Sequence, residues 1–171
     1  ETELVLSDGL HVNGTPLVAA LATVNFDAMG TNQLRALTSL QLAALPSTSL
    51  NTLTSTQLES LTSAQVRALT TDQISQGLST DQVAALTTGQ MVSLTTEQVS
   101  AGLTTNQVVA LRTDQIAALH TDQVVILTTD QLAAMETQDV AALSTTAVSV
   151  LTTDQINLGV TTNQIAALTT D

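Results

Sequence analysis

Residues Leu111 to Leu127 read LRTDQIAALHTDQVVIL and contain one eight-residue phrase, close to L-T-T-D-Q-V-A-A, twice in succession. Nearly all of the chain from residue 14 to residue 171 consists of variants of this phrase. Counted by the apolar residue at the position after the glutamine, the phrase occurs nineteen times between Val18 and Ile165, in fifteen steps of eight residues and three steps of nine. A strict internal period of this kind predicts a solenoid, in which every copy packs on its neighbours.

The spacing of apolar residues indicates what each copy folds into. A second apolar residue follows the first after three positions, or after four in the nine-residue copies. An unbroken α-helix would turn its apolar face by roughly 80° per eight-residue copy, and a strand would point residues three apart to opposite faces. The spacing suits one short helical segment per copy. We therefore predict an all-α solenoid of very short helices around a narrow aliphatic core.

Each copy also carries a signal for the start of a helix. Its second residue is always Ser or Thr, whose hydroxyl can accept a hydrogen bond from an unpaired helix N–H group, and Asp often follows, where the helix dipole favours an anion. The predicted N-caps include Thr71, Thr80, Thr113, Thr121, Thr129 and Thr153. In an alternative register, the preceding Thr is the cap and the Gln is its capping-box partner. The first position also holds Arg112, His120, Glu136 and Pro46, which favours the second Thr.

The three nine-residue copies share a glycine at one position, namely Gly77, Gly102 and Gly159. A glycine directly after a helix, followed by an apolar residue, is typical of a C-cap in the left-handed conformation. We therefore predict helices with one extra residue that end at these glycines. Gly77 and Gly102 are three copies apart, which hints at about three helices per superhelical turn.

Residues 1–13, ETELVLSDGLHVN, do not fit the repeat. A turn signal at residues 7–9 separates two extended segments, so we predict a small hairpin or extended cap over 1–13, followed by the solenoid over 14–171. The alternative is a strand donated to a neighbouring subunit. The sequence starts without Met and stops within a copy, so we expect it to be part of a longer array.

Composition excludes several classes of function. The net charge is −12, with three arginines and no lysine. Nucleic-acid binding depends on Lys and Arg that neutralise phosphates, so we expect no nucleic-acid partner. No apolar run approaches the length of a membrane-spanning helix, so we expect no membrane insertion. There is no Cys, which excludes disulfides and thiolate metal sites.

No set of unlike reactive groups occurs once at a spacing typical of catalysis, so we predict no catalytic residue, no resident cofactor and no enzyme activity. His11 and His120 fit solvated positions. Stacked Asp side chains could hold Ca²⁺, which prefers several oxygen ligands. The weak candidates are Asp72, Asp81, Asp114, Asp122, Asp130 and Asp154. The simpler interpretation is one Asp at each helix start as a partner of the helix dipole.

From residue 30 to residue 171 the pattern resembles the LTxxQ(V/I/L)xxL arrays of very large, secreted, repeat-rich bacterial surface proteins, often described as adhesin-like. The resemblance implies an extracellular or cell-surface location and a structural role. Our first hypothesis is a non-catalytic spacer, shaft or filament subunit that associates with itself or with neighbouring repeats. The alternative is a binding module whose Thr and Asp rows bind calcium, a glycan or a protein.

Overall fold

The computed structural model describes residues 11–12, 15–16 and 28–168. Within these residues it contains two short strands, fifteen α-helices and two π-helices. Their bounds are β1 (His11–Val12), β2 (Thr15–Pro16), α2 (Thr31–Ala36), α3 (Ser39–Ala43), α4 (Ser47–Leu50), α5 (Ser55–Ser60), α6 (Ser63–Ala68), α7 (Thr71–Gly77), α8 (Thr80–Ala85), α9 (Thr88–Met91), η2 (Gln98–Gly102), α10 (Thr105–Val109), α11 (Thr113–Ala117), α12 (Thr121–Val124), α13 (Thr129–Ala134), α14 (Thr137–Ala141), α15 (Thr145–Ser149), η3 (Gln155–Gly159) and α16 (Thr162–Leu168).

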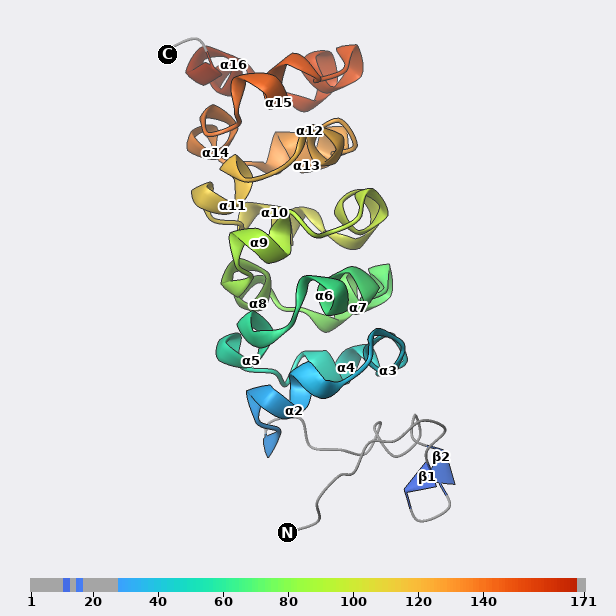
Figure 1. The fold of residues 1–171 in the computed structure, drawn as a ribbon. Coiled ribbons are helices and arrows are strands. Elements are labelled where there is room, and N and C mark those ends of the chain that lie inside the picture. The colour runs from blue at the N-terminus through green and yellow to red at the C-terminus, as the bar shows by residue number, and fades with distance from the viewer. Residues whose placement is uncertain (1–10, 13–14, 17–27, 169–171) are drawn as a thin grey trace.

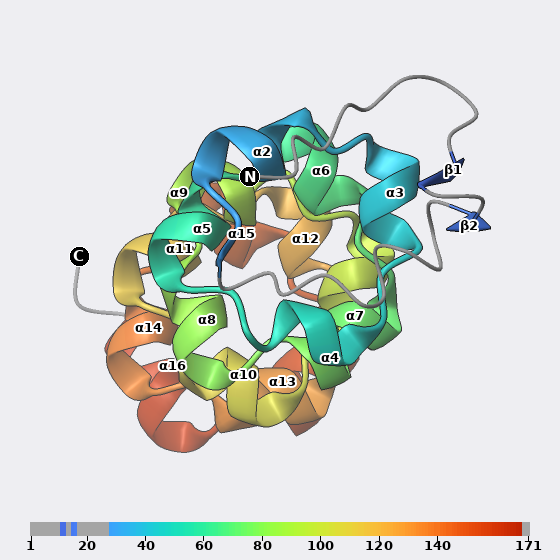
Figure 2. The same cartoon turned by 90° about the horizontal axis from the view of Figure 1, so that it is seen from below.

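The helices stack into a column with α2 at one end and α16 at the other (Figure 1). Seen along its axis, the column is a ring of short helices around a central core (Figure 2). One helix forms per copy because each copy is long enough for little more than one turn before the next cap begins. The structure confirms the all-α solenoid of very short helices. No helix in the described part of the chain is both long and apolar enough to cross a membrane.

The core is a single cluster built mainly from the two apolar positions of the copies between Met29 and Leu143. In α6, Val66 is fully buried and Leu69, three residues later, is 4% exposed. The same pair is buried in successive copies, for example Leu34 with Leu37 and Val83 with Leu86. This confirms the predicted aliphatic core. Each copy contributes only two such side chains. Their burial therefore depends on the turns above and below.

Contacts between helices define the size of one superhelical turn. From α5 onward, helices pack against the third helix before them, as α5 does against α2, α6 against α3 and α7 against α4. Glutamine side chains reach one copy further back: the Gln65 amide, near the start of α6, donates to the carbonyl oxygens of Leu34 and Leu37 at 2.8 Å. A turn therefore takes between three and four copies, slightly more than the glycine spacing suggested.

The predicted N-caps are wrong by one residue. The cap of α7 is Thr70, and Thr71 is the first helical residue. Thr70 Oγ1 accepts a hydrogen bond from Gln73 N at 3.1 Å, and Gln73 Oε1 accepts one from Thr70 N at 2.9 Å. This reciprocal capping box needs the cap three residues before the glutamine, which selects the alternative register.

The other predicted caps shift in the same way. The residues that cap, or occupy the cap position, precede the predicted ones: Ser79 precedes Thr80, Arg112 precedes Thr113, His120 precedes Thr121, Thr128 precedes Thr129 and Thr152 precedes Thr153. Where this residue has no hydroxyl, the glutamine alone still binds its backbone: Gln115 Oε1 accepts from Arg112 N at 2.8 Å. That bond explains why the first position tolerates Arg and His.

The glycines do not form left-handed C-caps. Gly77, Gly102 and Gly159 are the last residues of α7, η2 and η3, and none of them has a left-handed backbone. A Cβ atom on Gly77 would lie 2.8 Å from the Ser47 carbonyl oxygen, so glycine is required here by close packing against α4. The ninth residue is absorbed within the helix: Leu103 N donates to Gln98 O at 2.9 Å across a π-turn.

Of the predicted N-terminal cap, residues 1–10 and 13 lie outside the described residues. β1 pairs with β2 in antiparallel register, His11 opposite Pro16 and Val12 opposite Thr15. Thr15 and Pro16, which the period assigned to the first copy, are therefore extended rather than helical. The hypothesis of a donated strand stays a prediction.

Candidate functional site

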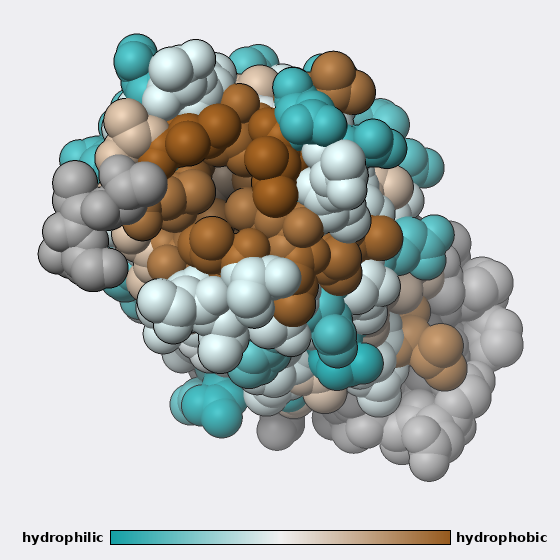
Figure 3. All heavy atoms as spheres, turned by 90° about the horizontal axis from the view of Figure 1, so that it is seen from above, coloured by the Kyte–Doolittle hydropathy of each residue, from teal (hydrophilic) through white to brown (hydrophobic). Residues whose placement is uncertain are grey.

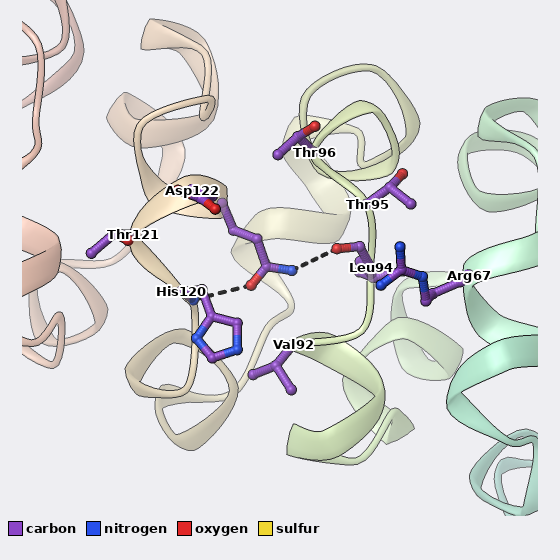
Figure 4. A pocket seen from close by; sticks show the side chains of 9 residues that line it. Arg67, Val92, Leu94, Thr95, Thr96, His120, Thr121 and Asp122 are labelled. Carbon is purple, nitrogen blue, oxygen red and sulfur yellow. Dashed lines mark hydrogen bonds between the residues drawn. The ribbon is translucent and has the colours of Figure 1, made fainter.

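The most constant polar feature of the column is a row of buried glutamines, one near the start of almost every helix. Gln123 is an example, and Figure 4 labels two residues that it binds, His120 and Leu94, with the hydrogen bonds as dashed lines. Its Oε1 accepts from His120 N at 3.1 Å and so caps the backbone of α12. Its Nε2 donates to Met91 O and to Leu94 O, both at 2.9 Å, in the turn below. One amide therefore fixes the start of its own helix and ties two turns together.

We call the residues that make this bond between turns the glutamine ladder. In the described part of the chain they are Gln57, Gln65, Gln73, Gln82, Gln90, Gln98, Gln107, Gln115, Gln123, Gln131, Gln155 and Gln164. All twelve are at most 6% exposed. Only an amide of this length offers both an acceptor for the cap and two donors for the carbonyl oxygens. Replacement by Glu would remove the donors and bury a charge.

The sequence carries a signal for the ladder in addition to the capping-box pattern. The same polar residue recurs directly before the first core position, although Glu and Lys are equally good helix formers. A helix-propensity argument does not explain that selectivity. A requirement for a side chain that both accepts and donates does explain it.

Asp139 and Ala147 interrupt the ladder in two consecutive helices, α14 and α15. Asp139 is 3% exposed, and its Oδ1 accepts a hydrogen bond from Thr113 Oγ1 at 2.7 Å. Burial raises the pKa of the Asp139 carboxyl, the Thr113 hydrogen bond opposes this shift, and the nearby charge of Glu136 adds to it. Ala147, 1% exposed, has no polar side chain at all. Neither ionised Asp139 nor Ala147 has a side-chain donor for the carbonyl oxygens of the turn below.

The substitution Asp139→Gln is expected to stabilise the column by roughly 1–3 kcal/mol at neutral pH, because it removes a buried charge and restores the ladder donors. The unfolded chain ionises Asp139 near the ordinary pKa of 3.8, whereas the folded chain holds the proton to higher pH. Ionised Asp139 therefore destabilises the folded state above its raised pKa, and this penalty disappears as the pH falls toward 3.8. The stability gap between variant and wild type should shrink over that window.

Chemical unfolding at a series of pH values measures this gap. Asp130→Gln is the matched control, because Asp130 is an exposed acidic residue at the start of α13. Its effect should stay within about 0.5 kcal/mol. A gap for Asp139→Gln that does not change with pH would exclude Asp139 as the titrating group.

A recess with a largely polar lining crosses successive turns beside Gln123 (Figure 4). It has a volume of about 540 Å³, and its lining residues include Arg67, Val92, Thr95, His120 and Asp122. A second recess of about 330 Å³ shares Arg67 and Thr95 with it and adds Glu97. Both signs of charge thus line one open surface.

The acidic residues proposed for calcium do not form a site in the structure. Asp72, Asp81, Asp114, Asp122, Asp130 and Asp154 are all exposed. Within the ranges that the structure describes, no three His, Asp or Glu side chains come together in a group that could hold a metal ion. Asp114 pairs instead with Arg112 at 2.9 Å, and this hydrogen bond lowers the pKa of its carboxyl.

Comparison with known proteins identifies the repeat. The family model described as the ALTTAQ repeat matches four segments of the chain, residues 18–55, 47–76, 98–129 and 132–170. Together these segments cover well over half of the 171 residues. No curated protein and no solved structure matches the chain.

Proposed function

The chain belongs to the ALTTAQ repeat family, and from this premise we propose that it is a non-catalytic structural module of a secreted bacterial surface protein. In this role the column is a spacer or shaft that holds other parts of the protein away from the cell. The extracellular location rests on the resemblance of the repeat to arrays in such surface proteins.

The glutamine ladder is the observation that supports a structural role most directly. From Gln57 to Gln131 every copy binds the turn below it through a buried side-chain amide, without interruption. These bonds connect turns along the column, in the direction in which a shaft carries load. The repeated geometry of the copies thus holds successive turns together, and the exposed acidic residues keep the surface hydrated.

The exposed core at one end of the column supports a proposal about the partner. At the α16 end the core positions of the last copies are open: Ile156 is 45% and Ile165 is 43% exposed, whereas Ile116 in an inner turn is 1% exposed. Figure 3 shows the apolar surface that these copies present at this end. An apolar layer with this spacing fits another layer of the same repeat. We infer that the module associates with neighbouring repeats, in the same chain or in another copy.

An antibody against the purified module tests the proposed location. It should label intact cells of the source bacterium, and brief treatment with an external protease should remove the label. A cytoplasmic protein assayed in the same cells controls for lysis. Labelling that appears only after the cells are made permeable would contradict the proposal.

A further inference from the structure

The two interruptions of the ladder lie next to each other in the last described turn. Counting back by the spacing of the ladder, a glutamine at position 139 would bind Val108 O and Leu111 O, and one at position 147 would bind Ile116 O and Leu119 O. Among the described residues, no side chain donates to these four carbonyl oxygens. We call the boundary where α14 packs on α11 and α15 packs on α12, beside these four carbonyl oxygens, the open seam.

The other side of the same turn is fastened. Gln155 Nε2 donates to Val124 O at 2.9 Å and to Leu127 O at 2.8 Å. Gln164 Nε2 donates to Leu132 O at 3.0 Å and to Met135 O at 2.7 Å. Glutamine amides thus tie η3 and α16 to the turn below, whereas α14 and α15 meet that turn through packing against α11 and α12 and lack such amides.

The open seam has a single side-chain bond across it, from Thr113 Oγ1 to Asp139 Oδ1 at 2.7 Å. Asp139 and Ala147 are nevertheless almost completely buried. The seam is therefore closed by packing while it lacks the polar bonds that hold every turn from Gln57 to Gln131. These four carbonyl oxygens lose little when the seam opens, because water can then donate the hydrogen bond that a ladder amide would otherwise supply.

We propose that α14 and α15 form a hinged segment that opens away from α11 and α12, and from the side of α16 that packs on α14, while η3 and α16 stay attached to the turn below. Opening exposes the four carbonyl oxygens and the core side chains beside them. The segment is a built-in point of local unfolding within a column that is otherwise tied at each copy. This inference goes beyond the structural role proposed above and does not depend on the location of the protein.

Hydrogen exchange of the intact protein tests the hinge. Amides of residues 136–151 are expected to exchange at least about tenfold faster than their equivalents one turn earlier, residues 104–119. They should also exchange faster than residues 152–168, although these lie closer to the end of the chain. Simple fraying from that end predicts the reverse order. Equal protection of 136–151 and 104–119, or exchange that rises steadily toward residue 168, would overturn the proposal.

A paired substitution gives a second measurement. In the Asp139→Gln/Ala147→Gln variant, the ladder is complete, and the protection of residues 136–151 should rise to that of residues 104–119. The control variant is Ala117→Gln/Ala133→Gln, which adds the same side chains at exposed helical positions outside the ladder. It should leave the difference in exchange unchanged. If the ladder variant also leaves it unchanged, the missing amides are not its cause.

Discussion

The Gln73→Leu variant is expected to lose roughly 3–4 kcal/mol of unfolding free energy. Gln73 is 2% exposed, and its Nε2 donates to Leu42 O at 2.9 Å and Leu45 O at 2.7 Å, while its Oε1 accepts from Thr70 N at 2.9 Å. Leucine has a similar volume and is apolar, so the loss comes from backbone groups left without partners rather than from a cavity. Equilibrium unfolding in urea, followed by circular dichroism, measures it.

The matched control is Gln33→Leu. Gln33 has the same position in its copy and caps Gly30 N at 2.8 Å, but it is exposed and is not a member of the ladder. Its replacement removes a cap bond alone, and we expect a loss of about 1 kcal/mol or less. Equal losses for the two variants would show that the glutamines act only as caps and that the bonds between turns contribute nothing.

The Gly77→Ala variant is expected to lose about 2–3 kcal/mol, which is the second-largest effect. The added Cβ would lie 2.8 Å from Ser47 O and 3.1 Å from Ser47 Cα. Both contacts are to backbone, so they can be relieved only by moving α7 away from α4. That movement would also lengthen the Gln73 bonds to Leu42 and Leu45, which strengthens the expected loss.

Gly89→Ala provides the opposite expectation in the same fold. Gly89 lies in α9, and a Cβ there would meet only Thr87 Oγ1, at 3.9 Å. Alanine is the better helix former, so this variant should gain up to about 1 kcal/mol. The two melting temperatures should therefore move in opposite directions. A loss for Gly89→Ala of the same size as for Gly77→Ala would mean that helix-end flexibility, and not contact with Ser47, makes glycine necessary.

The core positions could be predicted from the sequence and the N-caps could not, because the first depend on contacts within one helix and the second on contacts between turns. The pair Val66 and Leu69 could be assigned to the core because i, i+3 spacing is a property of one helix and needs no neighbour. The choice between Thr70 and Thr71 as cap could not be made by propensity, because both residues can accept the same kind of bond. The capping box with Gln73 decides it, and that glutamine is held in place by Leu42 and Leu45 from another turn.

By itself the sequence determined the period, the short helices, the aliphatic core and the absence of a basic surface, because these follow from spacing and composition along the chain. Only the tertiary structure decided that the glutamines tie turns together, that Gly77 is needed for its closeness to Ser47, and that Asp139 and Ala147 leave one seam open. Each of these depends on residues about 26 to 33 positions apart. Their approach is set by the pitch of the superhelix, which a repeat of eight residues does not specify until the layers are packed.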